Sequence, residues 1–429
     1  MLGHGTEQAR GHDTGDTNKL PTSISRPLSQ KWNASVPETD TDSGRGATPW
    51  VAWASRMRAF ILQAGTVMTE ADLLKEAERL QALLRAHAAR HDRDTTFPEE
   101  GREASVRSPL NTMLRDGASW LTFGRVVSLL AQGDASFATA WLMHQGAADA
   151  LRFLADPAQL SAFEADFRGG AWFSNALGEP SSGNQFLMPQ QEARRAEGGW
   201  RLTGAKRFVS GGEHAKYLLT NALCEGQPRF FLIDKKDASI RVEEIWDSMG
   251  MRGTRSQLLH FQDTLLPESR VLKIDPTHPS AIAVGLAWIS LGIAEAAMGA
   301  AISYAKERRL PPENKPLAEL QWIQFAIADM SIRLEAARSL AMRSATATDQ
   351  RAPDSILLQM QAKVVANEAA VSITTAALEI AGGSGYLRSR PIERYVRDAM
   401  SGQVMAWSAP VTKDFLGKAL LGLMGPPPG

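Results

Sequence analysis

The spacing of apolar residues predicts helices in the first part of the chain. Between residues 48 and 168, apolar positions recur with the spacing of amphipathic helices in Ala71–His91, Trp120–Leu130 and Ser136–Leu154. The first of these helices carries an apolar stripe made of Leu73, Leu74, Ala77, Leu80, Leu83 and Leu84. Residues 1–47 are instead rich in Gly, Thr, Ser, Asp and Pro. They bury too little apolar surface to offset the entropy of ordering, so we expect a mobile tail.

The pattern changes to short apolar runs between residues 169 and 275. Turn-forming residues separate these runs, including the glycine pairs at 198–199 and 211–212 and Pro228. Short runs with turn signals at this spacing predict a central antiparallel β domain. From residue 276 to residue 429 the helical spacing returns. The long helices expected there are Ser280–Arg308, Leu317–Thr346, Pro353–Ala381 and a last helix from Ile392 onward.

The order helices, sheet, helices indicates a large α+β protein. Its 429 residues are enough for one large core or for two to three smaller ones. The 47 basic and 47 acidic side chains cancel, so net charge gives no reason to expect nucleic acid or an anionic membrane as a partner. The single cysteine, Cys224, excludes an internal disulfide and fits a reducing compartment. With no secretory pattern at the N-terminus, we expect a cytoplasmic protein without a metal site.

One apolar run, Ala281–Ile302, is long enough to raise the question of a membrane span. Glu295 lies near its middle, where an acidic group would cost about 2.5–3.5 kcal/mol on insertion scales. The run is also richer in Ala and Gly than in Leu and Ile. We therefore interpret it as a helix buried inside a soluble bundle.

The most informative motif lies near the C-terminus. Residues Ala377–Ser408 read ALEIAGGSGYLRSRPIERYVRDAMSGQVMAWS. This run resembles the flavin-contacting end of the acyl-CoA dehydrogenase superfamily, and the resemblance extends over nearly the whole chain beyond residue 50. It implies an N-terminal helical domain, a central β domain and a C-terminal four-helix bundle. It also implies FAD between the sheet and the bundle, and a homodimer or homotetramer in which a neighbouring subunit contributes to binding the flavin.

Segments of the predicted β domain resemble parts of the family that meet the flavin ring. Trp200–Gly212 (WRLTGAKRFVSGG) is similar to a strand that ends Trp-Ile-Thr-Asn-Gly in the family. That similarity implies that Phe208 packs near the flavin ring and that the Ser210 hydroxyl donates a hydrogen bond near N5, the atom that accepts hydride. Trp172–Gly183 (WFSNALGEPSSG) is similar to the family's Thr-Glu-Pro-Gly-Ala-Gly-Ser loop, which implies backbone contacts with the ring and a contact from Ser182.

A further segment resembles the family's Met-Gly-x-Arg motif. It is Trp246–Pro267, which reads WDSMGMRGTRSQLLHFQDTLLP. The resemblance implies that Arg252, Thr254 and Ser256 lie near the substrate entrance or the dimer face. The alternative for each of these side chains is an ordinary solvated loop.

Other matches concern the nucleotide part of the cofactor. Tyr304–Arg308 resembles a helix end whose arginine binds the flavin diphosphate held mainly by the adjacent subunit, but the Thr-Phe-Gly that follows in the family is absent here. A guanidinium suits a diphosphate because it presents a planar fork of donors. The resemblance assigns cofactor contacts to Arg308, Gln321, Glu379, Gly382, Gly383 and Ser408. A plain helix C-cap is the alternative for the two glycines.

The family's catalytic base is missing from its usual position. Counting from Arg397-Asp398-Ala399 brings the family's Tyr-Glu-Gly-Thr block to Met405–Ser408, so Ala406 stands where the glutamate is expected. Met405 and Trp407 would then line a reshaped substrate pocket. The alternative family site for the base, near Ile282, has no carboxylate either.

Several functions remain open from the sequence. In the first, which we favour at this point, the enzyme oxidises an acyl thioester of coenzyme A or of a carrier protein. The base would then be relocated, and His144 and His214 are the candidates. In the second, it is a flavin-dependent monooxygenase of the same fold that uses a peroxide of the reduced flavin, FAD or alternatively FMN. The partners would be a small-molecule substrate and an electron acceptor or a flavin reductase. A non-catalytic flavoprotein is a minor third alternative.

Overall fold

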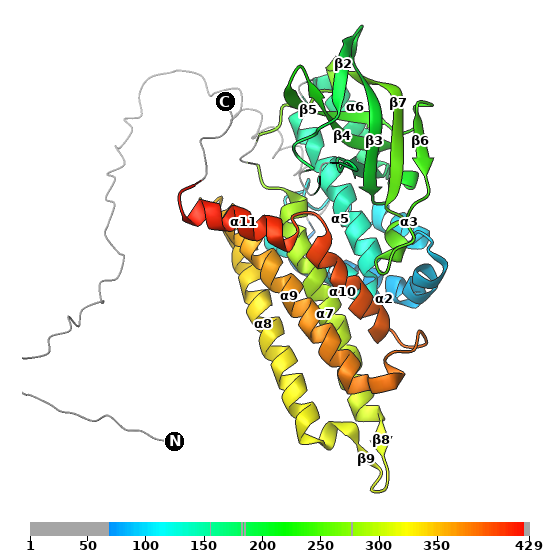
Figure 1. Cartoon of the computed structure of the whole chain (residues 1–429), viewed down its shortest axis with the longest axis vertical. Coiled ribbons are helices and arrows are strands. Elements are labelled where there is room, and N and C mark those ends of the chain that lie inside the picture. The colour runs from blue at the N-terminus through cyan, green and yellow to red at the C-terminus, as the bar shows by residue number, and fades with distance from the viewer. Residues whose placement is uncertain (1–67, 155, 182, 184–185, 276–277, 424–429) are drawn as a thin grey trace, which may run out of the picture. The chain divides into compact units, whose positions relative to one another are not determined.

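The computed structural model describes residues 68–154, 156–181, 183, 186–275 and 278–423. The predicted tail, residues 1–47, and Ser182 lie outside the described residues. The described residues belong to one compact unit. Figure 1 shows its helices and strands in the order that the apolar pattern predicts.

The N-terminal part is helical, as expected. Its helices are α2 (Glu70–Asp94), α3 (Glu99–Val106), α4 (Trp120–Gly133), α5 (Ala135–Asp149) and α6 (Pro157–Arg168). Side-chain oxygens cap several of their first turns. Thr69 and Asp72 form a reciprocal capping box on α2, and Asp134 accepts from two backbone N–H groups of α5. The apolar stripe predicted on α2 faces the core, with Leu73, Ala77, Leu80 and Leu84 buried and the other two leucines half-buried.

The central part is a seven-stranded sheet. The strands are β1 (Phe173–Ala176), β2 (Glu192–Ala196), β3 (Gly199–Val209), β4 (Tyr217–Cys224), β5 (Gln227–Asp234), β6 (Ile240–Glu243) and β7 (Gln257–Pro267). Their order is β1-β4-β2-β3-β7-β6, and β5 lies off this path, paired with β4 along the whole length of that strand. The pairs β2–β3, β3–β7, β4–β5 and β6–β7 are antiparallel, whereas β1 and β2 each run parallel to β4. Turn signals mark where strands end but not which strands pair, so the parallel pairs escaped the prediction of an antiparallel domain.

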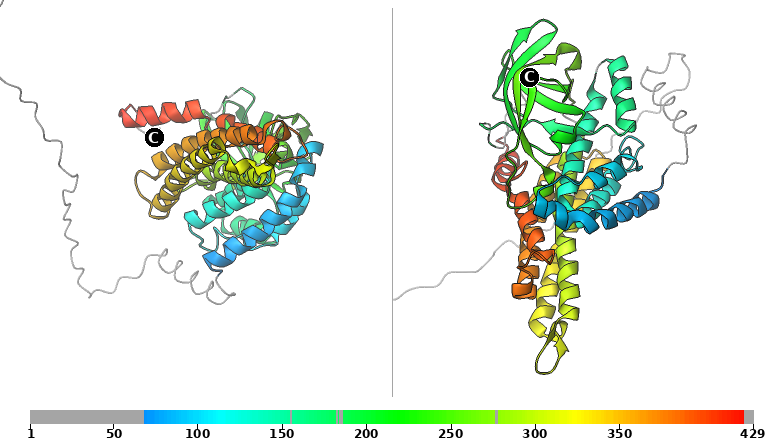
Figure 2. Two further views of the ribbon diagram at one scale, coloured as in Figure 1. Left: turned by 90° about the horizontal axis from the view of Figure 1, so that it is seen from below. Right: turned by 90° about the vertical axis from the view of Figure 1, so that its right-hand side faces the viewer.

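Long helices return after the sheet. They are α7 (Ala281–Glu307), α8 (Gln321–Asp349), α9 (Ser355–Ala381), α10 (Ile392–Val404) and α11 (Ala409–Leu420). The two-residue strands β8 (Arg309–Leu310) and β9 (Lys315–Pro316) pair between α7 and α8. Figure 2 shows α7, α8, α9 and α10 side by side, and α9 contacts each of the other three. The helical bundle predicted at the C-terminus is therefore present.

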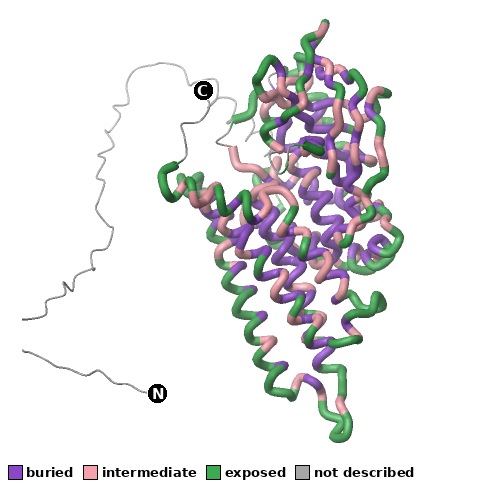
Figure 3. Tube along the Cα trace, viewed as in Figure 1, coloured by how far each residue is buried: buried purple, intermediate pink, exposed green. Residues whose placement is uncertain are grey.

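One hydrophobic core joins the N-terminal helices, the sheet and the bundle. Buried residues accordingly run through the interior of all three parts in Figure 3. Close packing depends on small residues, since a Cβ added at Gly124 of α4 would lie 2.3 Å from the indole of Trp288 on α7. Two segments of the described chain, Ala281–Glu307 and Ser355–Ser384, have the length and composition of membrane spans. Their apolar windows are 72% and 56% buried within the chain, as in core helices.

Candidate active site

The residues predicted to hold the cofactor, to line the substrate pocket or to stand at the usual base position fall into two groups in one chain. The first group, at the end of β3 and between α10 and α11, is Phe208, Ser210, Met405, Ala406, Trp407 and Ser408. The second group, where α7 ends, α8 begins and α9 ends, is Arg308, Gln321, Glu379, Gly382 and Gly383. Gly402 near the end of α10 contacts Asn367 of α9, which is fifteen residues before Gly382. At 1.5 Å per helical residue, the two groups are roughly 22 Å apart along α9.

Two aromatic residues of the first group have strained backbones. Phe208 has φ 60° and Trp407 has φ 53°, in the left-handed region that bulky side chains rarely adopt. Phe208 lies within a register shift between β3 and β7. The residue is 54% exposed, and its ring centroid is 5.9 Å from that of Trp246. Trp407 contacts Phe186, with ring centroids 5.1 Å apart. Strained residues of this kind concentrate at functional sites, where the surrounding structure holds them in place.

A buried ion pair fastens the loop after β1 to this end of β3. Lys206 Nζ lies 2.7 Å from Glu179 Oε1, and both side chains are completely buried. Lys206 also donates to Asn221 Oδ1 at 2.9 Å, and the Arg207 N–H donates to Gly178 O at 2.8 Å. The pair therefore holds the loop predicted to meet the flavin edge next to Phe208. Sequence reasoning missed Lys206, because Arg201 and Arg207 lie in the same strand and nothing local distinguishes the buried lysine from them.

The Ser210 hydroxyl starts a chain of hydrogen bonds that leads away from the site. Its Oγ lies 2.7 Å from Ser256 Oγ, which lies 2.8 Å from Thr254 Oγ1. Thr254 in turn donates to Met251 O at 2.9 Å. Thr254 and Ser256 are buried, so the alternative of a solvated loop does not describe them.

His144 lies in the core and not in an open pocket. Its Nδ1 accepts from the Phe173 N–H at 2.9 Å, and its Nε2 lies 2.9 Å from Asn111 Oδ1. The ring stacks on Trp172 at 4.2 Å. Burial lowers the pKa of His144 to about 3. Because both ring nitrogens already have partners, neither is available to accept a proton from a substrate.

His214, the other candidate base, follows the turn after Ser210. It is exposed, stacks on Phe97 at 4.2 Å and forms an ion pair with Glu99 of α3 at 3.3 Å. Burial of part of the ring lowers the pKa of His214, although Glu99 and Glu213 raise it. These contacts direct its ring toward α3.

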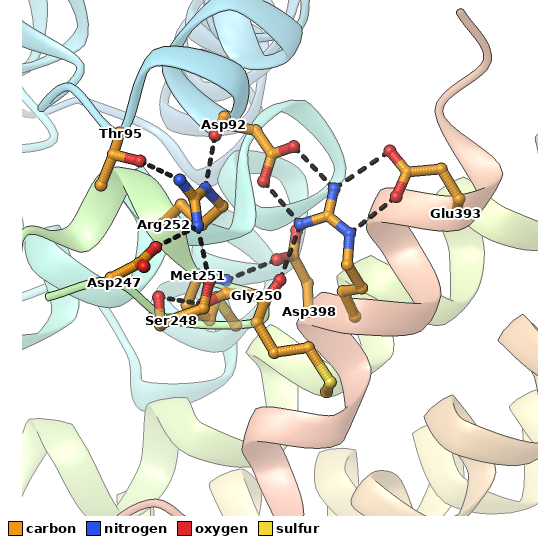
Figure 4. A network of polar contacts seen from close by, with 11 residues as sticks. Asp92, Thr95, Asp247, Ser248, Gly250, Met251, Arg252, Glu393 and Asp398 are labelled. Atoms are coloured by element: carbon orange, nitrogen blue, oxygen red, sulfur yellow. Dashed lines mark hydrogen bonds and ion pairs between the residues drawn. The ribbon is translucent and has the colours of Figure 1, made fainter. Parts of the chain in front are cut away.

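A network of charged side chains holds α10 against α2 and against the loop between β6 and β7 (Figure 4). Arg397 donates to both oxygens of Asp92 and of Glu393, while the Met251 N–H donates to Asp398 Oδ1 at 2.6 Å. Gly250 is needed here, since an added Cβ would lie 2.4 Å from Arg397 O. The Arg-Asp pair of the sequence motif therefore positions α10, and the segment Met405–Ser408 follows directly from that helix.

Arg252, predicted to lie near the substrate entrance or the dimer face, belongs to the same network. It donates to Asp92 O and Ser248 O, both at 2.8 Å, and forms an ion pair with Asp247. Its guanidinium thereby ties the loop between β6 and β7 to the end of α2. The side chain thus has a structural role within one chain.

We predict that Asp398→Asn changes the pH dependence of stability. Burial raises the pKa of Asp398 from 3.8 to about 7, although Arg394 and the Met251 N–H lower it. The folded state therefore binds this proton more tightly than the unfolded state, so this group makes the free energy of unfolding fall as pH rises from about 4 to about 7. Asn cannot ionise and keeps the acceptor for Met251.

Urea unfolding of both proteins measures this effect. Between about pH 6 and pH 8, the free energy of unfolding should fall by about 1.4 kcal/mol more for wild type than for the variant. Subtracting the free energy of unfolding of the variant from that of wild type at each pH removes the contribution of all other titrating groups. Identical pH dependence would show that Asp398 is ionised throughout this range in the folded protein.

Side chains of α9 and α7 anchor the last turn of α10. Lys363 Nζ donates to Gly402 O at 3.2 Å, and Asn367 Nδ2 donates to the same oxygen. Ser290 of α7 donates to Asn367 Oδ1 at 2.7 Å. Burial lowers the pKa of Lys363 to about 8. These contacts satisfy a carbonyl at the helix end and orient the Met405–Ser408 segment that follows.

The second group is open to solvent in the single chain. Arg308, Gln321 and Glu379 are exposed. Gly382 has φ 55°, and an added Cβ at Gly382 or Gly383 would meet no heavy atom within 4 Å. The β8–β9 hairpin follows Arg308 in place of the family's Thr-Phe-Gly.

The chemistry of both groups fits a flavin nucleotide. At the end of β3 there is an exposed aromatic ring at Phe208 and a hydroxyl at Ser210. Nearby in β1, Asn175 Oδ1 is buried with no hydrogen-bond partner in the part of the chain that the structure describes. The second group offers a guanidinium and an unobstructed glycine backbone, which suit a diphosphate. The described residues contain no group of three or more His, Cys, Asp and Glu that could hold a metal.

A helix–sheet–helix fold with these groups defines a flavin-dependent oxidoreductase. The sequence matches the acyl-CoA dehydrogenase middle domain over residues 174–264 and the acyl-CoA dehydrogenase C-terminal domain over residues 282–421. The chain belongs to the acyl-CoA dehydrogenase superfamily, whose cofactor is FAD.

The relatives include several activities. The chain is 29% identical over 376 residues to 3-sulfinopropanoyl-CoA desulfinase of Paraburkholderia xenovorans, covering 81% of this chain and 95% of the relative. It resembles butyryl-CoA dehydrogenase of Megasphaera elsdenii at TM-score 0.76 and 26% identity, covering 83% of this chain and 100% of that one. Dibenzothiophene monooxygenase TdsC of Paenibacillus sp. A11-2, at TM-score 0.72 and 22% identity over 83% and 99% of the two chains, has the same fold. The fold thus occurs in both dehydrogenases and monooxygenases.

Proposed function

We propose that this protein is a flavin-dependent monooxygenase that binds reduced FAD and oxygenates a small organic substrate beside Phe208 and Trp407. FMN is the alternative flavin. Bound reduced flavin supplies the two electrons that activate dioxygen; one oxygen atom enters the substrate and the other leaves as water. A flavin reductase would supply the reduced cofactor.

The surroundings of the three candidate positions for a base carry this proposal. Position 406 is alanine, both ring nitrogens of His144 have partners in the core, and His214 faces Glu99 of α3. Oxidation of an acyl thioester needs a group that removes the α-proton. Oxygenation by reduced flavin has no such requirement, so these contacts reverse the preference drawn from the sequence.

Thioester oxidation is the second candidate. It is favoured by the similarity to butyryl-CoA dehydrogenase and to the desulfinase, whose names both specify coenzyme A thioesters. In that case the chain would pass electrons from the flavin to an electron acceptor. The base would have to come from a residue other than those discussed above.

A homo-oligomer is part of the proposal. The two groups of predicted site residues are too far apart along α9 for one chain to surround both the flavin ring and the flavin diphosphate. A second copy would bring its Arg308 and Gly382 to the nucleotide part. The outer face of α8 suits such a contact, because Trp322, Phe325 and Ile332 are exposed there.

The visible absorption of the flavin distinguishes these candidates. The purified protein is loaded with oxidised FAD and mixed anaerobically with a panel of acyl-CoA thioesters. We expect the flavin to stay oxidised, and the reduced complex to consume dioxygen with a substrate-dependent rate. Bleaching by a thioester would establish the dehydrogenase instead, and failure to bind either oxidation state of FAD or FMN would contradict both.

We predict that Ala406→Glu introduces thioester oxidation. A carboxylate at this position would stand where the family's base acts, and general bases typically contribute at least about 100-fold to a rate. The rate of anaerobic bleaching by butyryl-CoA should rise at least tenfold over wild type. Ala406→Gln is the matched control, because it has the same size without a basic oxygen. Equal rates in both variants would contradict the alignment of Ala406 with the base.

A further inference from the structure

Three buried hydroxyl groups connect the proposed flavin site to a backbone carbonyl. Ser210 is 9% exposed, Ser256 3% and Thr254 1%. The oxygen–oxygen distances are 2.7 Å from Ser210 to Ser256, 2.8 Å from Ser256 to Thr254 and 2.9 Å from Thr254 to Met251 O. All three distances are those of O–H···O hydrogen bonds.

A proton count gives this chain one direction. There are three contacts, and each hydroxyl has one proton, whereas the carbonyl of Met251 has none. The Thr254 proton must therefore lie in the contact with Met251 O. The Ser256 proton then lies in the contact with Thr254, and the Ser210 proton in the contact with Ser256. Ser210 consequently presents only lone pairs to the site.

The opposite direction would be less stable. If Ser210 donated into the site, Ser256 would have to donate to Ser210 and Thr254 to Ser256. Thr254 Oγ1 and Met251 O would then face each other at 2.9 Å with no proton between them. The hydrogen bond between the Thr254 hydroxyl and Met251 O would be lost, leaving the Thr254 N–H and Trp246 Nε1 as the donors to that carbonyl.

We infer that the chain Ser210–Ser256–Thr254 makes the site select reduced over oxidised flavin, an inference that rests on the proposed function and deepens it. N5 of oxidised flavin is an acceptor and would meet the lone pairs of Ser210. N5 of reduced flavin carries a hydrogen and can donate to the same oxygen. This reverses the role expected from the sequence, in which Ser210 donates to N5. Ser210 touches the cofactor, while Ser256 and Thr254 are positioning residues.

Thr254→Val is the variant that tests this inference. Valine has nearly the shape of threonine but supplies no proton, and Met251 O keeps the Thr254 backbone N–H at 3.1 Å and Trp246 Nε1 at 3.0 Å as donors. Ser256 is then free to donate to Ser210, and Ser210 to donate to oxidised N5. Thr254→Ser is the matched control because it retains the hydroxyl.

The measurement is the dissociation constant of the full-length protein for oxidised FAD and, anaerobically, for dithionite-reduced FAD. Wild type and Thr254→Ser should bind reduced FAD about tenfold more tightly than oxidised FAD. A tenfold preference of this kind raises the two-electron potential of the bound flavin by about 30 mV. Thr254→Val should lose most of this preference. Ser210→Ala should lose it as well, and the double variant should lose no more than either single variant.

Two results would overturn the inference. An unchanged ratio in Thr254→Val would show that the hydroxyl chain does not set the polarity of Ser210, while leaving the proposed binding of flavin intact. If no variant and no wild-type protein bound FAD or FMN in either oxidation state, both the inference and the proposed function would be wrong. Circular dichroism of each variant establishes that the fold is unchanged.

Discussion

Lys206→Met is expected to lower the free energy of unfolding by about 3–5 kcal/mol, the usual cost of removing one partner from a buried ion pair. Both side chains of the Lys206–Glu179 pair are completely buried. Burial lowers the pKa of Lys206, although Glu179 raises it. Methionine retains the volume of the lysine stem but removes the cation beside the Glu179 carboxylate, which keeps the Gln190 and Gln191 N–H groups as donors. The loop after β1 should then separate from β3, and flavin binding should weaken in parallel.

Chemical denaturation of a matched pair of variants checks this prediction. Lys413→Met removes a cation whose ion pair with Glu368 is exposed, with 60% and 54% of the two side chains accessible. An exposed pair contributes about 0–1 kcal/mol, so this control should be nearly neutral. The double variant Lys206→Met/Glu179→Leu should recover part of the loss, because the buried carboxylate is removed together with its cation. Equal effects of Lys206→Met and Lys413→Met would contradict the prediction, because the buried pair would then contribute no more to stability than the exposed one.

Arg397→Met should have the second large effect, about 3 kcal/mol or more. Arg397 joins Asp92 and Glu393 through both oxygens of each carboxylate and also donates to Met249 O at 2.8 Å. Only 17% of its side chain is exposed, and its partners are less exposed still. Without the guanidinium, two carboxylates face each other with their mutual repulsion uncompensated. The end of α10, which leads into Met405–Ser408, loses its connection to α2.

Unfolding and flavin binding should be measured together for this variant. Arg79→Met is the control, since Arg79 pairs with Glu76 on one helix and 57% of its side chain is exposed. That substitution should change stability by at most about 1 kcal/mol and leave the flavin affinity unchanged. If Arg397→Met were as mild as its control, the network in Figure 4 would not be what holds α10 in place.

The two groups of cofactor residues also explain why one chain gives an incomplete picture of the site. The motif Ala377–Ser408 is continuous in sequence, yet its glycines and its Met405–Ser408 end lie on different parts of the bundle. The break after Gly385 lets α10 turn back along α7 and α9. Neighbouring residues of one motif therefore serve different parts of the cofactor, and in our proposal different copies of the chain.

The sequence by itself determined the longer helices, their approximate ends and the order helices, sheet, helices, but not α3, α6 or the division of the last helix into α10 and α11. These features depend on local periodicity and on capping or turn residues, which act over a few positions. Motifs with a recognisable order of residues also identified the family. The resemblance to that family predicts the roles of positions Phe208, Ser210 and Ala406.

Only the tertiary structure decided what surrounds those positions. The pairing of β1 with β4, the contact of His144 with Phe173 and the contact of Ser210 with Ser256 join residues 29 to 46 positions apart. No local pattern specifies such contacts, because they depend on how separate elements pack. The same is true of the hydrogen-bond direction at Ser210, which follows from a carbonyl in another loop that has no proton to give.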